Sequence, residues 1–110
     1  MKLSEIVKTL NLEVCCGNCE VDVRYGCVGD LLSEVMAHAK SDSIWVTVQS
    51  HVNIIAVSVI TGIRAIVLCN AHSFSNETIE KAKAEGVCLL RTDKSPFEIV
   101  GRLYGMGIEP

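Results

Sequence analysis

Short apolar runs alternate along the chain with longer segments whose apolar residues recur at helical spacing. Over residues 3–10 the apolar positions fall at i, i+3, i+4 and i+7, which predicts an amphipathic helix. Further helices are predicted over 30–39, 53–61, 75–85 and 95–104, and strands over 12–15, 44–48, 65–69 and 87–90. A short strand near 21–24 is also predicted. In 53–61 the density of Val and Ile leaves a strand as the alternative to a buried helix.

Several helix ends carry recognisable signals. Ser75 and Ser95 are predicted N-caps, and Pro96 follows the second of these at the first helical position. Gly86 is predicted to end the helix that begins after Ser75. Asp30 is a further predicted N-cap.

Strands that alternate with helices from residue 44 onward indicate parallel pairing, with helices on both faces of the sheet. We therefore expect an α/β fold, a three-layer α/β/α sandwich with a small, mostly parallel sheet. Residues 1–110 are expected to form a single domain, because the length is typical of one domain and no linker or repeat is visible.

Polar side chains follow three of the predicted strands. They are Gln49, Ser50, His51 and Asn53 after the first, Asn70 and His72 after the second, and Arg91, Thr92, Asp93 and Ser95 after the third. The carboxyl ends of parallel strands meet at one edge of a sheet, where ligands commonly bind. The same side chains also suit helix caps and backbone hydrogen bonds, so the sequence leaves a ligand site and a structural role as alternatives.

Catalytic chemistry is not indicated. His51 has no acid or nucleophile paired with it in sequence, and the spacing of Asp30 and Asp93 does not require a carboxylate pair. No glycine is followed by Lys-Ser or Lys-Thr, which excludes a P-loop kinase. We expect a protein that is not an enzyme.

The composition and charge of the chain limit the kinds of partner it is expected to bind. The net charge is −3 and the basic residues are scattered, which disfavours nucleic-acid binding. The longest apolar run, 54–60, is too short to span a bilayer, and the amino terminus does not resemble a signal peptide. A hydrophobic content of 49% is high for a small chain and predicts a homodimer. We expect a cytoplasmic protein with reduced cysteines.

The cysteines offer a different hypothesis. Residues 15–19 read Cys-Cys-Gly-Asn-Cys, and Cys27 lies eight positions further on. A zinc ion or an iron–sulfur cluster held by Cys16, Cys19 and Cys27 is chemically possible. A second pair of cysteines at metal-ligand spacing is missing, and Cys69 and Cys88 read as small hydrophobic residues of strands.

Four segments resemble the DRTGG domain family in order and spacing. They are residues 29–33 (Gly-Asp-Leu-Leu-Ser), 45–53 (Trp-Val-Thr-Val-Gln-Ser-His-Val-Asn), 77–82 (Glu-Thr-Ile-Glu-Lys-Ala) and 97–104. The resemblance covers about residues 3 to 108, and it adds Asp30 and Ser33 to the candidate ligand-binding residues. The stretch that gives the family its name is not intact: the nearest segment, residues 22–27, reads Asp-Val-Arg-Tyr-Gly-Cys.

The resemblance implies a fold like the amino-terminal domain of HPr kinase/phosphorylase and a regulatory or accessory role. Related domains lie beside phosphotransacetylase catalytic domains or between the nucleotide-sensing domains of regulated pyrophosphatases. We therefore predict a non-catalytic module that senses a small ligand such as an adenine nucleotide. The alternatives are a metal or iron–sulfur protein that uses the Cys15–Cys27 cluster, and a structural partner of a larger enzyme.

Overall fold

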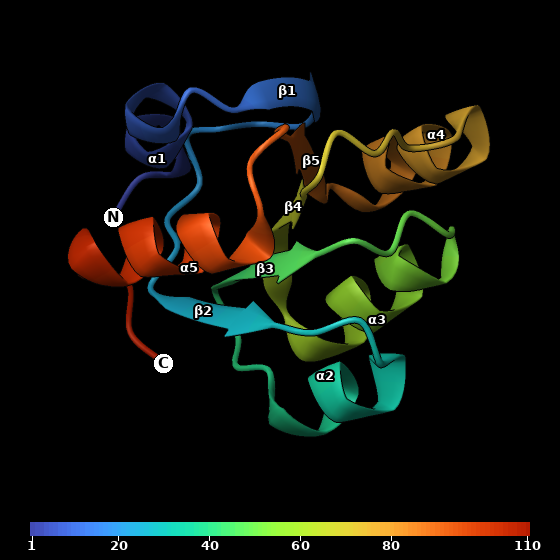
Figure 1. Cartoon of the computed structure of the whole chain (residues 1–110). Coiled ribbons are helices and arrows are strands. Elements are labelled where there is room, and N and C mark those ends of the chain that lie inside the picture. The colour runs from blue at the N-terminus through green and yellow to red at the C-terminus, as the bar shows by residue number, and fades with distance from the viewer.

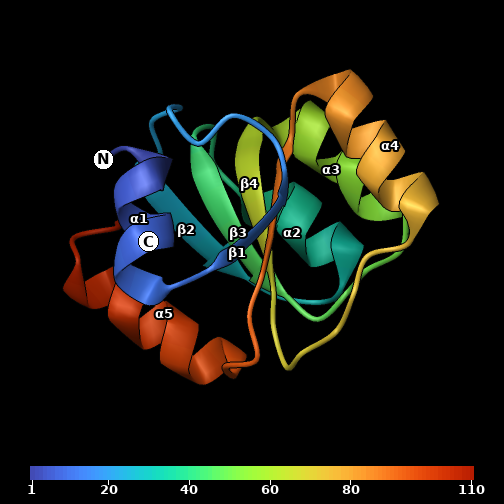
Figure 2. The ribbon, with the colours of Figure 1, turned by 90° about the horizontal axis from the view of Figure 1, so that it is seen from above.

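The computed structural model describes residues 1–110, and its backbone places one β-sheet between two layers of helices (Figure 1, Figure 2). The strands are β1 (Glu13–Cys16), β2 (Tyr25–Val28), β3 (Ser43–Thr47), β4 (Ile63–Leu68) and β5 (Cys88–Arg91). The helices are α1 (Leu3–Leu10), α2 (Leu32–His38), α3 (Asn53–Thr61), α4 (Asn76–Glu85) and α5 (Pro96–Gly105). The predicted three-layer α/β/α sandwich is confirmed.

The sheet has the strand order β1-β5-β4-β3-β2. β2, β3, β4 and β5 pair in parallel, and β1 pairs antiparallel with β5 at one edge, with a register shift between Val14 and Cys16. The sheet is therefore mostly parallel, as predicted, with one antiparallel edge strand.

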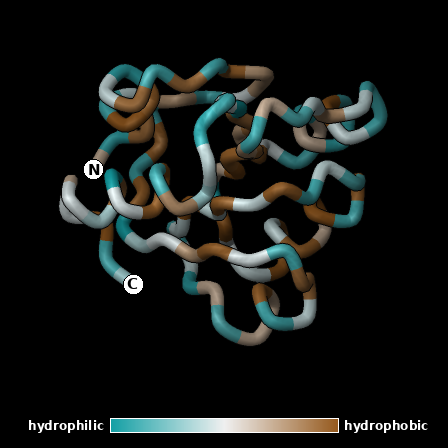
Figure 3. Tube along the Cα trace, viewed as in Figure 1, coloured by the Kyte–Doolittle hydropathy of each residue, from teal (hydrophilic) through white to brown (hydrophobic).

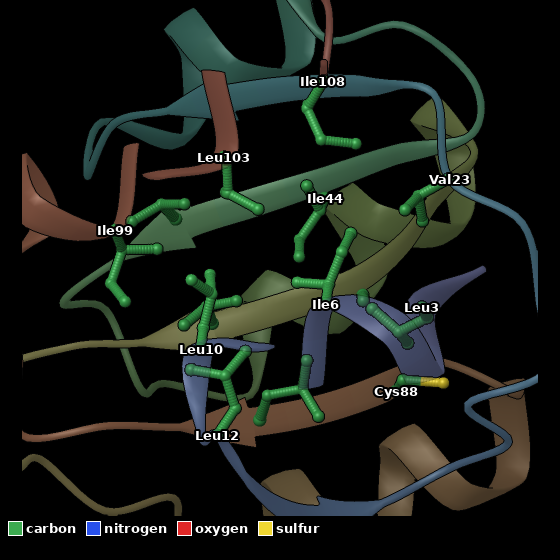
Figure 4. Packing of buried hydrophobic residues seen from close by; sticks show 14 of the residues in the cluster. Leu3, Ile6, Leu10, Leu12, Val23, Ile44, Cys88, Ile99, Leu103 and Ile108 are labelled. Atoms are coloured by element: carbon green, nitrogen blue, oxygen red, sulfur yellow. The ribbon is translucent and has the colours of Figure 1, made fainter. Parts of the chain in front are cut away.

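Two hydrophobic clusters hold the layers together because successive strand residues point to opposite faces. Ile44 and Val46 of β3 pack toward α1 and α5, while Trp45 between them packs toward the other helices. Figure 4 shows part of the first cluster, with Ile6 and Leu103 reaching the sheet from α1 and α5. The helices carry both hydrophobic and hydrophilic positions (Figure 3), as elements with one buried side do.

The connections between the parallel strands all run on one side of the sheet. α2, α3 and α4 link β2 to β3, β3 to β4 and β4 to β5, and all three helices lie on the same face (Figure 2). After β5 the chain crosses to α5 on the opposite face. The loops that follow β4 and β5 are therefore the neighbouring pair that leads to opposite faces, the arrangement that opens a crevice at the end of a parallel sheet.

Most boundaries agree with the sequence. Residues 53–61 form a helix, and the side chains of Ser75 and Ser95 accept backbone N–H bonds as the predicted N-caps. Gly86 follows α4 with a left-handed φ of 73°. None of these helices is both long and apolar enough to cross a membrane.

Two local predictions were wrong. The second strand lies at Tyr25–Val28 and not at residues 21–24. Asp30 does not cap α2, because the helix begins at Leu32 with Leu31 in the N-cap position and no side-chain cap bond. The Asp30 carboxylate instead binds groups at the end of β3.

Gly17 tests the packing of the segment after β1 against β5, and Gly101 in α5 serves as its control. Gly17 has φ +107° and a Cβ there would lie 2.6 Å from Cys88 Cα, whereas a Cβ on Gly101 in α5 would meet nothing within 4 Å. We expect Gly17→Ala to lower the free energy of unfolding by about 1–3 kcal/mol through backbone strain and overpacking. Gly101→Ala is expected to raise it by about 0.5–1 kcal/mol through helix propensity. Urea denaturation measures both, and equal midpoints for the two variants would contradict this packing.

Candidate functional site

The predicted polar residues do meet at one edge of the sheet. β2, β3, β4 and β5 run in parallel, so the loops at 29–31, 48–52, 69–75 and 92–95 all leave from their carboxyl ends. We call this set of loops the polar edge. Seven of the nine predicted ligand-binding residues are exposed there or in the first turn of a neighbouring helix, while Ser50 is half-buried and Thr92 is buried.

Asp30 joins the ends of β2 and β3. Its Oδ1 accepts hydrogen bonds from Thr47 Oγ1 at 2.8 Å and from the Val48 N–H at 2.9 Å. Gln49 Nε2 donates to the Asp30 carbonyl oxygen at 3.1 Å. Thr47 is fully buried, so Asp30 satisfies a hydroxyl that would otherwise lack an acceptor. Asp30 Oδ2 makes no bond within the chain.

The loop before α3 is also held by its own residues. His51 Nδ1 accepts from the Asn53 N–H at 3.2 Å, and the Ser50 carbonyl accepts from Thr78 Oγ1 at 3.0 Å. The Ser50 contact fastens the loop to α4. Ser33 is exposed in the first turn of α2 and makes no side-chain hydrogen bond. The structural role left open by the sequence is thus real for Asp30 and His51.

The loop after β4 carries unusual backbone. Asn70 and Ala71 both have φ of 61°, a conformation that costs a residue other than glycine about 1–2 kcal/mol. It turns the Ala71 and His72 carbonyls toward Arg91, which donates to them at 3.2 and 3.0 Å. The Asn70 N–H donates to the Lys94 carbonyl at 2.9 Å. The two diverging loops are therefore fastened to each other.

A polar cavity of about 240 Å³ lies where those loops diverge. Thr92 and Asp93 line it with Ala71 and Arg91, as do Asn11 and Glu13 from the beginning of β1 and the turn before it. Asn11 and Glu13 were not anticipated. They reach the cavity because β1 pairs antiparallel with β5 and sets Glu13 opposite Arg91, and periodicity along the chain carries no signal for that pairing.

The cysteines do not form the predicted metal site. Cys16 lies on β1 and Cys27 on β2, which are the two opposite edge strands of the sheet. No group of three or more potential metal-ligating side chains is assembled anywhere in the structure. The prediction that Cys16, Cys19 and Cys27 share a metal ion is therefore wrong. Between residues 16 and 25 the chain passes from one edge of the sheet to the other, so cysteines that are close in sequence lie far apart in the fold.

Burial raises the pKa of the Cys27, Cys69 and Cys88 thiols to about 11 from an ordinary 9.0. These thiols are un-ionised at neutral pH and behave as small hydrophobic groups. All six cysteines are free.

A second, apolar cavity of about 180 Å³ lies between β2 and α5. Its walls come mainly from hydrophobic residues of β2, β3, α5 and the segment that follows α5. They are Gly26, Cys27, Val28, Val46, Val100, Leu103, Tyr104, Ile108, Glu109 and Pro110. Neither Gly26 nor Tyr104 was singled out as a site residue from the sequence.

No protein-family model and no curated protein matches the sequence. The fold, however, is similar to a solved chain that contains the CBS and DRTGG domains of the regulatory region of Clostridium perfringens pyrophosphatase, in complex with its activator diadenosine tetraphosphate. The TM-score is 0.78 at 20% identity, over 98% of this chain and 47% of the other. The present chain thus spans about half the length of that chain. The likeness shows the fold, which is that of a DRTGG-like domain.

Asp30 and Asp93 are both exposed, yet only Asp30 has partners within the chain. We expect Asp30→Ala to lower the free energy of unfolding by about 1–3 kcal/mol, because Thr47 Oγ1 and the Val48 N–H lose their acceptor. Asp93→Ala is expected to change it by less than about 0.5 kcal/mol. Thermal and urea unfolding of the two variants decide this, and an equal effect of both would remove the structural role assigned to Asp30.

Proposed function

We propose that this chain is a non-catalytic regulatory domain that senses an adenine nucleotide. The observation that carries the proposal is the match, over nearly the whole chain, to a regulatory region that was solved with an adenine-nucleotide activator. We also propose that residues 1–110 form one DRTGG-like domain, and that it is cytoplasmic, where its six free thiols would stay reduced.

Some side chains of the polar edge remain free to bind a ligand, which supports the proposal. The side chains of Ser33, Asn53, Asn70 and Asp93 are exposed and make no hydrogen bond within the chain. Amide, hydroxyl and carboxylate groups of this kind bind the hydroxyls of sugars and similar polar ligands. We propose a non-catalytic role because His51, the one histidine at the end of β3, is not set up for catalysis. Its Nδ1 accepts the Asn53 N–H, and no nucleophile is bonded to it.

Titration of the purified chain with ATP, ADP, AMP and diadenosine tetraphosphate tests the proposal. We expect saturable binding of at least one of these at a ratio of one per chain, measured by isothermal titration calorimetry and native mass spectrometry. Recovery of the nucleotide unchanged after prolonged incubation is expected, since the domain is proposed to sense it and not to consume it. An absence of binding by all four, or turnover of the bound nucleotide, would overturn the proposal.

A second observation favours a protein partner. α3 contains no charged residue, and Val59 and Ile60 on its outer side are 49% and 70% exposed. Met36 of the neighbouring α2 is 44% exposed. Beyond its first residue, α3 is apolar on its exposed side as well as on its buried side. Such a helix is normally covered, so we propose that this surface packs against a second copy of the chain. A larger enzyme is the alternative occupant.

Substitution on this surface tests the dimer. Ile60→Lys is expected to convert a dimer to a monomer in analytical ultracentrifugation, because a charge would be buried at the contact. Lys81→Ala on the charged outer side of α4 is the matched control and should leave the dimer intact. A wild-type chain that sediments as a monomer would leave the larger enzyme as the occupant of this surface.

A further inference from the structure

The outer edge of β2 presents unpaired backbone groups. The N–H groups of Tyr25 and Gly29 donate toward the β3 side, to the carbonyls of Asp42 and Val46 at 3.3 and 3.2 Å. Because backbone groups alternate sides along a strand, the N–H and C=O groups of Gly26 and Val28 point away from the sheet.

The segment after α5 covers only the first part of this edge. The Glu109 N–H donates to the Arg24 carbonyl at 3.0 Å, and the Gly26 N–H donates to the Glu109 carbonyl at 2.8 Å. The next groups along the edge, the Gly26 carbonyl and the Val28 N–H, have no hydrogen-bond partner within the chain. The Gly26 carbonyl, an acceptor, and the Val28 N–H, a donor, are thus neighbouring free groups on the outer edge of β2, just beyond the part that Glu109 covers.

The two residues that carry these groups lie at the apolar cavity between β2 and α5. Gly26 and Val28 both line it, and Val46, Val100, Leu103 and Ile108 form its apolar walls. Figure 4 shows Ile108 and Leu103 on this side of the sheet, beside β2 and β3. A Cβ at position 26 would lie 3.0 Å from Ile108 Cγ2, so the glycine lets Ile108 pack directly against β2 at the wall of the cavity. Tyr104, which is 70% exposed, completes the lining.

The cavity suits one planar ring. Its volume of about 180 Å³ is below the about 300–1,000 Å³ of sites that enclose a whole drug-sized ligand. A flat apolar group therefore fits inside with the remainder of its molecule outside. Aromatic rings bind bases by stacking, and Tyr104 is the aromatic residue of the lining.

We propose that this cavity binds the adenine base of the nucleotide, an inference that rests on the proposed function and places the base away from the polar edge. Adenine presents its N6–H₂ donor beside a ring-nitrogen acceptor. The N6–H₂ group would donate to the Gly26 carbonyl, and the ring nitrogen would accept from the Val28 N–H. The base lies on the apolar walls with one face toward Tyr104.

The adjoining part of the polar edge receives the sugar. Asp30 is the second residue after Val28, and its Oδ2 is free because both bonds from the β3 end go to Oδ1. A carboxylate oxygen is a strong acceptor for ribose hydroxyls. The base cavity and the polar edge thus form two parts of one site.

Base selectivity is the first test. Inosine triphosphate replaces the N6–H₂ donor of ATP by an oxygen acceptor, which would face the Gly26 carbonyl. We expect it to bind at least about tenfold more weakly than ATP, because two acceptors would face each other and the hydrogen bond to the Gly26 carbonyl would be lost. Equal affinities for the two, measured by calorimetry, would overturn the proposed pairing.

Variants of β2 provide the second test. Val28→Pro removes the N–H donor at a position on an edge strand where the sheet does not use it, and Val28→Ala is its control because it keeps the donor. We expect the proline variant to bind ATP at least about fivefold more weakly than the alanine variant. Should the proline variant fail to fold by circular dichroism, Tyr104→Ala replaces it. That side chain is exposed, and its loss should weaken ATP binding by about fivefold or more.

The outcomes separate this inference from the proposed function. A wild-type chain that binds no adenine nucleotide refutes both. A chain that binds ATP while Val28→Pro and Tyr104→Ala bind it unchanged keeps the proposed function and overturns the base cavity. A proline variant that changes the sedimentation coefficient without changing ATP affinity also overturns it, and assigns the edge to pairing with a strand of a second chain.

Discussion

Burial of both faces of the parallel strands is the constraint on which the remainder of the structure depends. The strand residues of β3 and nearly all of those of β4 are buried, so helices must cover the sheet on each side. Three crossover helices supply one layer, and α1 and α5, from the two ends of the chain, supply the other. Residues of the first helix and of the segment after α5, such as Leu3 and Ile108, are thus part of the core.

That same arrangement determines what the carboxyl edge can do. Because three successive crossovers lie on one face, the loops after β2, β3 and β4 all turn the same way, and side chains such as Asp30 and His51 are used to hold them in place. Only between β4 and β5 do neighbouring loops separate to opposite faces, and there Arg91 and the left-handed residues 70 and 71 draw them together again. Polar residues at the strand ends of this sheet therefore have a structural role, whether or not they also bind a ligand.

The sequence predicted the architecture well because its signals are local. The periodicity of residues 3–10, the caps at Ser75 and Ser95 and the apolar runs of β3 and β4 each depend on residues a few positions apart. What it missed depends on pairing between distant segments. Strand order is the source of three such features, and periodicity does not encode it. It sets Glu13 opposite Arg91, it separates Cys16 from Cys27, and it leaves a free edge at Gly26 and Val28. Asp30 illustrates the same limit, since a residue suited to a cap found a better partner in Thr47 on a neighbouring strand.

The two edges of the sheet are protected in different ways. On β1 the register shift between Val14 and Cys16 interrupts the regular spacing of backbone groups, and such a bulge discourages a further strand from adding there. On β2 the protection is the short stretch at Ile108 and Glu109, which occupies the beginning of the edge and leaves the end open. The resistance of this protein to edge-to-edge aggregation therefore depends on a few residues after α5. Any change that loosens them would expose a longer template for cross-β association than the folded chain presents.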